Sequence, residues 1–227
     1  MITVHHLNNS RSQRVLWLLE ELHQPYIVKR YQRDPKTMLA PPELLRVHPL
    51  GKSPVITDGD LTIAESGAIV EYLVDTYGAA ADAPLRPAAG TPAKLRYTYW
   101  LHFAEGTAMP PLVMKLVFNK IKTSPMPFFV RPIARSIARK VESSFIDPNL
   151  ARQIAFMEDE LHTKGPWFCG EHFSAADIQM SFVLEAAAQR AGLSQETTPR
   201  VLDWLARAHA RPAFARALVQ GGPYDFV

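Results

Sequence analysis

Two short stretches of the chain combine residue types suited to holding a small charged ligand. Lys52, Ser53 and Pro54 stand at the entrance of a predicted strand, where a proline needs a reason because it cannot donate a hydrogen bond to a sheet. A bound peptide that pairs with the main chain would be such a reason. Glu65 and Ser66 come where the next strand feeds a helix, whose free N–H groups and positive dipole favour an anion. The sequence therefore predicts a ligand site built from these two stretches.

Ser10 is the residue whose hydroxyl could do chemistry beside such a ligand. It lies just past the first predicted strand and just before a helix that contains Arg14, where it could also serve only as the cap of that helix. The loop before Arg14 could shift by one or two residues, so Asn9 and Ser12 remain alternatives. Cys169, the single cysteine, lies far along the chain and is predicted to be a packed thiol.

His5 and His6 are the residues that could suggest a metal site. Adjacent residues of a strand point to opposite faces of the sheet, so the two rings are not expected to meet at one ion. No third ligand is marked near them in the sequence. We therefore predict no metal.

The elements that position these residues alternate between strands and helices in the first third of the chain. Residues 2–7 are predicted to form a strand, and an apolar stripe at i, i+3, i+4 and i+7 predicts a helix after it: Val15, Leu18, Leu19 and Leu22. A second strand and a short helix that opens on a proline follow. Two short strands joined at Asp58-Gly59-Asp60 then lead into a helix that stops before Gly78. Residues 1–78 are therefore predicted to form a small α/β domain.

The rest of the chain is predicted to be a linker followed by helices. Residues 79–90 have the small, proline-bearing composition of a linker. Residues 91–227 are predicted to form an all-helical domain, with an interruption at Pro110 and Pro111. The predicted fold class is therefore α/β plus all-α.

Two helix starts in the second domain are well marked. Ser174 followed three residues later by Asp177 predicts a capping box. Thr198 directly before Pro199 predicts another start, with a cap residue and a proline in the first turn.

The composition limits the classes of function. The chain has 227 residues, 47% of them hydrophobic and 21% charged, with a net charge of +3, as in ordinary globular proteins. It holds no apolar run as long as a membrane-spanning helix and no signal-peptide pattern, and one cysteine fits a reducing compartment, so we expect a cytoplasmic protein. Basic residues accumulate over 115–140 without a nucleic-acid motif, and a solvated helix face is expected there. Neither nucleic acid nor a membrane is an expected partner.

Three blocks of this sequence resemble cytosolic glutathione transferases over nearly the whole chain: "NNSRSQRVLWLLEEL", "HPLGKSPVITDGDLTIAESGAIVEYL" and "FSAADIQMSF". The first block, together with "PMPFFVRPIA", is similar to serine-type bacterial and fungal enzymes. The resemblance implies a thioredoxin-like N-terminal domain with a cis peptide bond before Pro54, and an all-helical C-terminal domain. It also implies a homodimer that uses glutathione as co-substrate, without a metal.

The resemblance assigns a role to each candidate binding residue. The main chain of Ser53 would pair with the cysteinyl unit of glutathione, and Lys52 would meet its glycyl carboxylate. At the other end, Ser66 would hold the γ-glutamyl carboxylate and Glu65 its ammonium. Ser10 would donate to the sulfur and favour thiolate over thiol.

An apolar electrophile needs an apolar wall, which we expect from the first helices after the linker. The candidates are Tyr99, Phe103, Met109 and Phe118. The resemblance implies a detoxifying transferase whose glutathione thiolate attacks a small apolar electrophile, a peroxide or a disulfide. A catalytically weak glutathione-binding or interaction module and a glutathione-dependent isomerase are the alternatives. The sequence does not identify the physiological electrophile.

Overall fold

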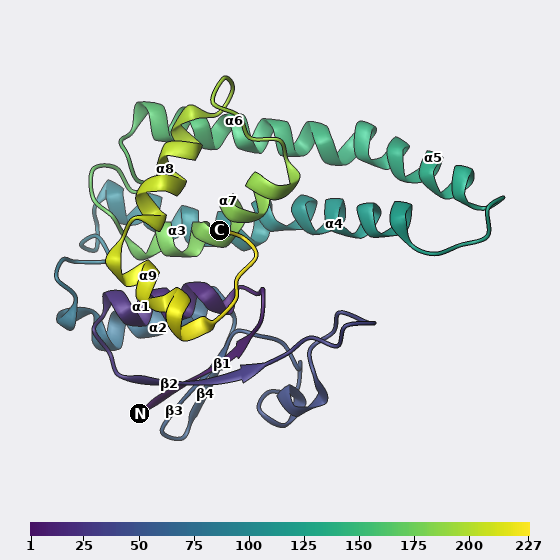
Figure 1. Cartoon of the computed structure of the whole chain (residues 1–227). Coiled ribbons are helices and arrows are strands. Elements are labelled where there is room, and N and C mark those ends of the chain that lie inside the picture. The colour runs from purple at the N-terminus through teal and green to yellow at the C-terminus, as the bar shows by residue number, and fades with distance from the viewer.

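Four strands form the sheet at the base of the molecule (Figure 1). The computed structural model describes residues 1–227. The strands are β1 (Ile2–Leu7), β2 (Tyr26–Tyr31), β3 (Val55–Asp58) and β4 (Leu61–Ala64). They lie in the order β2-β1-β3-β4, with β1 parallel to β2 and the other two pairs antiparallel. The β3–β4 pair is the hairpin predicted at Asp58-Gly59-Asp60.

Two helices pack on this sheet and separate it from the rest of the chain. They are α1 (Ser12–Glu21) and α2 (Ser66–Tyr77), and a short 3₁₀ helix, η1 (Pro42–Arg46), precedes β3. Every residue of α1 from Ser12 to Leu19 is buried, because the helix lies between the sheet and the helical part of the molecule. A helix buried on all sides can therefore carry polar residues such as Gln13 and Arg14 into the interface between the two units.

Seven α-helices make up the rest of the chain and lie above the sheet in Figure 1. They are α3 (Pro92–Phe103), α4 (Met109–Thr123), α5 (Arg131–Val141), α6 (Asp147–Thr163), α7 (Ala175–Arg190), α8 (Pro199–His209) and α9 (Pro212–Gly221). A 3₁₀ turn, η2 (Gly78–Ala80), follows α2. None of the helices combines the length and the hydropathy that a membrane crossing requires.

The prolines at 110 and 111 do not interrupt the helical chain as the sequence predicts. They lie in the first turn of α4, and a π-helical turn, η3 (Ala104–Ala108), joins α3 to α4 without a break. The wider turn accommodates two residues that have no N–H to donate. A second π-helical turn, η4 (Glu142–Ile146), joins α5 to α6 in the same way, so each pair of helices forms one long rod.

The predicted start of α7 is confirmed, and that of α8 has a different cap. Ser174 and Asp177 form the capping box, and α7 runs through the centre of the helical part. At α8 the hydroxyl of Thr198 bonds to Ser194 instead of the helix. The carboxylate of Glu158, from α6, accepts the N–H groups of residues 200 and 201 at 2.9 Å. A side chain distant in sequence thus provides the cap.

The two units meet in an apolar seam that polar pairs reinforce. The ring of Trp17 in α1 lies 5.5 Å from that of Phe173 and 5.1 Å from that of Phe214 in α9. At the other end of α1, Glu21 accepts two hydrogen bonds from Arg211, at 2.6 and 2.9 Å. The docking of α9 and α7 on α1 therefore fixes the position of the loop that contains Ser10.

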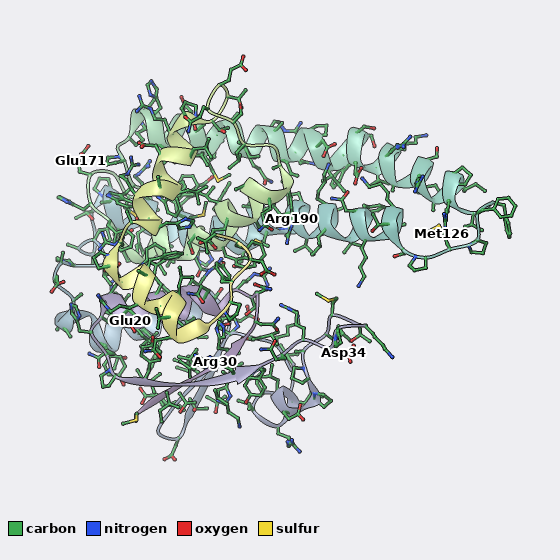
Figure 2. All side chains as sticks on the ribbon, viewed as in Figure 1. Glu20, Arg30, Asp34, Met126, Glu171 and Arg190 are labelled. Atoms are coloured by element: carbon green, nitrogen blue, oxygen red, sulfur yellow. The ribbon has the colours of Figure 1, made fainter.

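Two segments project from this body. Figure 2 shows Met126 at the turn between α4 and α5, and Asp34 near the end of the loop that follows β2. Phe128, in the α4–α5 turn, is 83% exposed. The projecting hairpin thus presents apolar side chains to solvent.

Candidate active site

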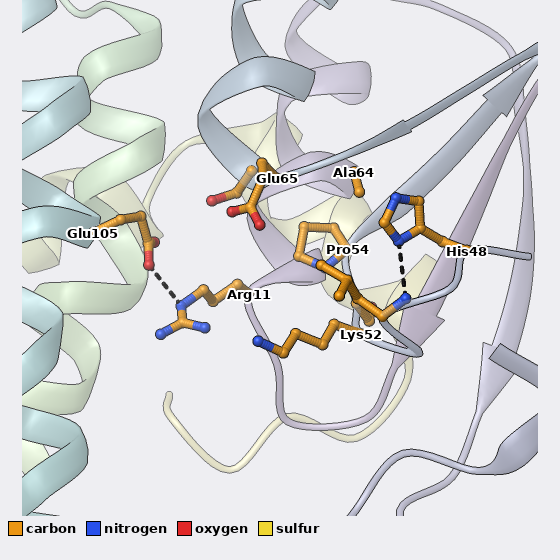
Figure 3. A pocket seen from close by; sticks show the side chains of 10 residues that line it. Arg11, His48, Lys52, Pro54, Ala64, Glu65 and Glu105 are labelled. Carbon is orange, nitrogen blue, oxygen red and sulfur yellow. Dashed lines mark hydrogen bonds and ion pairs between the residues drawn. The ribbon is translucent and has the colours of Figure 1, made fainter. Parts of the chain in front are cut away.

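Residues from both units line a cavity of about 100 Å³ (Figure 3). It contains all five of the predicted binding residues, Lys52, Ser53, Pro54, Glu65 and Ser66. Its other lining residues are Arg11, His48, Leu50, Ala64 and Glu105. The fold thus brings the loop after β1, the loop before β3 and the start of α2 together at this cavity, with η3 on the opposite side.

The segment at Pro54 has an exposed polar backbone. The peptide bond between Ser53 and Pro54 is cis, as expected. The Ser53 hydroxyl donates to the carbonyl of His5 at 2.8 Å and accepts from the N–H of Leu7 at 3.3 Å, so the side chain is tied to β1. The main-chain N–H and C=O of Ser53 have no partner within the protein. One donor and one acceptor are therefore free beside the cavity.

The start of α2 offers further donors. Glu65 precedes the helix with φ +70°, an uncommon conformation for a residue other than glycine. The Ser66 hydroxyl accepts hydrogen bonds from Arg14 at 3.3 Å and from Gln179 at 3.1 Å. Because both neighbours donate to its oxygen, its own proton is free to be donated. Together with the unpaired N–H groups of the first turn, this proton suits a carboxylate.

Two arginines share one carboxylate at the border of the cavity. Arg14 donates to Glu105 at 2.6 Å, and Arg11 lies 3.0 Å from the second oxygen of the same group. Burial lowers the pKa of Arg14, an effect that Glu105 opposes. In Figure 3, Arg11 and Lys52 extend into the same space, and Glu65 lies near them. A ligand bound there meets both signs of charge.

Sequence reasoning did not assign Arg11, His48, Glu105 or Gln179 to the site. Glu105 lies in η3 and Gln179 in α7, 95 and 169 positions after Ser10. These two residues reach the site only because the helical unit packs against the N-terminal unit, and a local sequence pattern does not predict that packing. His48 lies within the quoted "HPLGKSPV" block, so its position could have been suspected.

Ser10 lies next to this cavity but does not line it. It is 4% exposed, and its hydroxyl oxygen is 2.8 Å from that of Ser12. It also accepts the N–H of Ser12 at 3.2 Å, so it does satisfy a donor at the start of α1. The side chain of Asn9 is committed elsewhere, because it bonds to the side chain and the N–H of Asp225 in the C-terminal tail.

The four residues expected to form the electrophile pocket are not brought to this cavity. Tyr99 and Phe103, one helical turn apart, stack on each other at 5.6 Å, and Phe156 of α6 packs against both. Met109 is 3% exposed in the core, and Phe118 packs against that core from α4. Phe103 and Met109 are therefore part of the core and Phe118 packs against it, whereas Tyr99 is 47% exposed beside Phe103 and Phe156. Other faces of α3 and η3 are turned toward α2.

A hollow of about 440 Å³ adjoins the cavity and shares Glu65 and Glu105 with it. From α3 and η3 its lining includes Leu101, His102 and Gly106, none of which the sequence singled out. Aromatic rings do lie near the Ser10 loop, but on α7 and the C-terminal tail. The guanidinium of Arg11 is 5.9 Å from the ring of Phe182, which packs at a tilt against that of Phe226, with 5.0 Å between the ring centres.

Comparison with known proteins identifies the family. Residues 1–75 match the model of the glutathione S-transferase N-terminal domain, and residues 140–207 match that of the C-terminal domain. Glutathione S-transferase 3 of Schizosaccharomyces pombe is 37% identical to this chain over 94% of its length and 85% of the relative's. The chain belongs to the glutathione S-transferase family. It is thus a glutathione transferase that takes glutathione as a substrate.

Further glutathione S-transferases match over nearly their full length. Glutathione S-transferase 1 of Saccharomyces cerevisiae is 32% identical over 95% of this chain and 93% of its own. The crystal structure of a glutathione S-transferase from Actinobacillus pleuropneumoniae superposes with a TM-score of 0.80 at 30% identity, covering 100% of this chain and 95% of that one. The thioredoxin-like sheet with a helical C-terminal unit is the fold of these proteins.

Cys169 of this glutathione S-transferase is remote from the cavity and poorly suited to react. Burial raises the pKa of its thiol to about 11, although Ser174, whose hydroxyl oxygen lies 3.2 Å from the sulfur, acts in the opposite direction. A thiol with such a pKa is protonated at neutral pH and is a weak nucleophile. Cys169 is therefore not suited to be a reacting thiol.

Proposed function

We propose that this glutathione S-transferase is of the serine type and binds the cysteinyl unit of glutathione on the main chain of Ser53. The observation that carries the proposal is the free N–H and C=O of Ser53 at the edge of a cavity that also holds Lys52, Glu65 and Ser66. An extended tripeptide needs one donor and one acceptor at that point. Lys52 would then meet the glycyl carboxylate.

The γ-glutamyl end would bind at the start of α2. Ser66 supplies its hydroxyl proton and the first N–H groups of the helix to the α-carboxylate, and Glu65 supplies a carboxylate to the ammonium. Arg14 and Gln179 support this arrangement because they hold the Ser66 oxygen in place from two other helices.

Ser10 would activate the thiol by donating its proton to the sulfur. Of the three candidates, Asn9 is held by Asp225 and Ser12 is 0% exposed beneath its own hydrogen bonds, which favours Ser10. Lowering a thiol pKa by about two units corresponds to roughly 2.7 kcal/mol. The thiolate would then attack a small electrophile, a peroxide or a disulfide.

The test compares Ser10→Ala with Ser66→Ala in conjugation of glutathione to an aryl halide. Ser10→Ala should lower kcat by roughly tenfold to a thousandfold and raise the pH at which the bound thiol ionises, with glutathione affinity nearly unchanged. Ser66→Ala should show the reverse, with weaker glutathione binding and a smaller effect at saturation. Unchanged turnover in Ser10→Ala would overturn its role, and retained affinity in Ser66→Ala would overturn the placement of the γ-glutamyl end.

The alternatives give different results in the same assays. A binding module would be retained on immobilised glutathione but would turn over no aryl halide. An isomerase would convert a cis-double-bonded diacid without net consumption of glutathione.

We also propose that the protein is a homodimer. Apolar residues recur every four positions on the exposed sides of α4 and α5: Val113, Val117 and Ile121, with Ile133 and Ile137. The polar contacts between these rods, Lys115 with Asp147 and Lys122 with Glu142, lie on other faces. Exposed apolar stripes on neighbouring helices favour burial against a second copy.

Sedimentation analysis tests this proposal. The unaltered protein should have the mass of two chains, and Ile137→Asp should shift it toward one chain, because a carboxylate would be buried in the contact. Arg139→Ala, also on α5, is the control and should leave the mass unchanged. A single-chain mass for the unaltered protein would rule out the dimer.

A further inference from the structure

A line of three side chains leads from Ser10 into the interior. The Ser10 oxygen is 2.8 Å from the Ser12 oxygen, which is 2.9 Å from Nδ1 of His6. All three side chains are buried, with exposed fractions of 4%, 0% and 3%. The hydroxyls and the ring therefore form a continuous hydrogen-bonded path shielded from solvent.

Hydrogen bonds to its neighbours fix which atom of the His6 ring faces this path. Because Nδ1 faces Ser12, Nε2 is the ring nitrogen left for the backbone of Gly221, which raises the pKa of His6. Burial and the positive charge of Arg30, on the neighbouring strand β2, lower the pKa of His6 to about 4. The ring is thus neutral at ordinary pH, and in the tautomer that carries its proton on Nε2 the nitrogen Nδ1 is an acceptor.

The path points away from the ligand in the free protein. With Nδ1 as acceptor, Ser12 donates to His6 and Ser10 donates to Ser12, so the Ser10 proton is not aimed at a sulfur. A hydroxyl that must stabilise a thiolate has to reverse this direction. Shifting each proton one place along the path does so.

We propose that Ser12 and His6 form a proton relay that accepts the thiol proton of glutathione through Ser10. This rests on the proposed role of Ser10. The S–H bond breaks as the thiol proton passes to Ser10 Oγ, the Ser10 proton to Ser12 Oγ, and the Ser12 proton to Nδ1 of His6. The products are a thiolate and an imidazolium, and every hydroxyl now donates toward the sulfur.

A second cavity gives the relayed proton a way out. This cavity, of about 240 Å³, is lined by His6 together with Asn9, Arg30 and Tyr31, and by Gly221 of α9. The groups that face His6 are Arg30 from β2, Ser12 from α1 and Gly221, with Gln13 on the side of Gly221, so Arg30 is the charged one. Its positive charge drives the imidazolium to release a proton from Nε2 to solvent, which leaves Nδ1 protonated and donating to Ser12.

Thiolate absorbance of bound glutathione, followed against pH, tests the relay with two variants. Ser12→Ala removes the middle hydroxyl. His6→Asn keeps a hydrogen-bond acceptor but cannot take up a proton. Each variant should raise the pH midpoint of thiolate formation by about one unit, a tenfold loss of thiolate well below the midpoint. An unchanged midpoint in either variant contradicts the relay, so the test can still overturn it when one of the two variants fails to fold.

Two controls separate the relay from a structural role. S-methylglutathione has no thiol proton, so its affinity should be the same for the unaltered protein and both variants. Ser181→Ala removes a buried hydroxyl that donates to the Ile178 carbonyl in α7, and it should leave the midpoint unchanged.

Two results would overturn the relay. They are an unchanged midpoint in either variant that folds, and a midpoint shift accompanied by an equal loss of S-methylglutathione binding. If the unaltered protein itself forms no thiolate with glutathione, the proposed role of Ser10 fails first.

Discussion

Burial determines what each polar side chain around Ser10 can do. Ser53 and Ser66 use their side-chain oxygens to accept bonds from the protein, which leaves the Ser53 main chain and the Ser66 hydroxyl proton for a ligand. Ser12 has no exposed surface and can act only through its neighbours. Serines with the same chemistry therefore have separate roles because of where they lie.

The lowered pKa of His6 predicts a loss of stability in mild acid. In the unfolded chain His6 takes up a proton near its ordinary value of 6.5, whereas in the native state it does so only at about 4. The free energy of unfolding should therefore fall as the pH drops from about 6.5 toward 4, by about 2 kcal/mol at pH 5. Urea unfolding at several pH values measures this loss.

The variant His6→Asn isolates this contribution. His5, whose pKa is also lowered by burial and by Lys29, titrates in the same window and is unchanged in the variant. Between pH 6.5 and pH 5, the free energy of unfolding of His6→Asn should therefore fall by about 2 kcal/mol less than that of the unaltered protein. Equal slopes in the two proteins would contradict the assignment.

The binding residues could be predicted from sequence because they lie in two short segments whose strand, turn and helix signals are local. A predicted strand start is enough to place Lys52, Ser53 and Pro54, and a predicted helix start is enough to place Ser66. Glu105 and the residues of α3 and η3 that line the adjoining hollow could not be found in this way. Their place depends on which face of α3 meets α2, and that is set by the packing of the two units.

At the scale of elements, the helix ends show what local signals can and cannot give. Ser174 and Asp177 are close in sequence, and their capping box follows from the spacing. Glu158 caps α8 from another helix. The π-helical turns before α4 and α6 lie where one helix continues directly into the next. Tertiary contacts decide these features, so sequence patterns do not reveal them.

Substitution of Asp177 is expected to cause a large loss of stability. Its two oxygens accept from four donors, namely the N–H and hydroxyl of Ser174, the N–H of Phe168 and the indole of Trp204, at 2.9–3.0 Å. Asp177→Ala would leave them unpaired in the core and should lower the free energy of unfolding by about 3–5 kcal/mol.

Ser174→Ala is the matched comparison for this prediction in chemical denaturation. It removes one hydroxyl at the same helix end and should cost about 1 kcal/mol. If Asp177→Ala costs no more than Ser174→Ala, the carboxylate does not organise this junction.

For the whole molecule, the site exists only where the two units dock. Arg14 comes from α1, and its partner Glu105 comes from the helical unit. The Ser66 hydroxyl is likewise held by Gln179 across the same boundary. Ser66, a binding residue of the N-terminal unit, is thus held by a residue that lies 113 positions later in the chain.

Glu105→Gln tests this coupling. It leaves the fully buried Arg14 side chain without its countercharge, with Arg11 still nearby, and should lower the free energy of unfolding by roughly 2–4 kcal/mol. Asp203→Asn breaks the exposed pair with Arg207 and should cost less than about 1 kcal/mol. Equal effects of the two variants in urea unfolding would show that the buried pair does not couple the units.

Trp17 has a consequence for observing this protein in solution. Its indole is completely buried against aromatic rings of the other unit. Its emission should therefore shift to longer wavelength as soon as the sheet unit separates from the helices, before either unit unfolds. Replacing the remaining tryptophans with phenylalanine would leave an intrinsic optical reporter of that separation, without any attached dye.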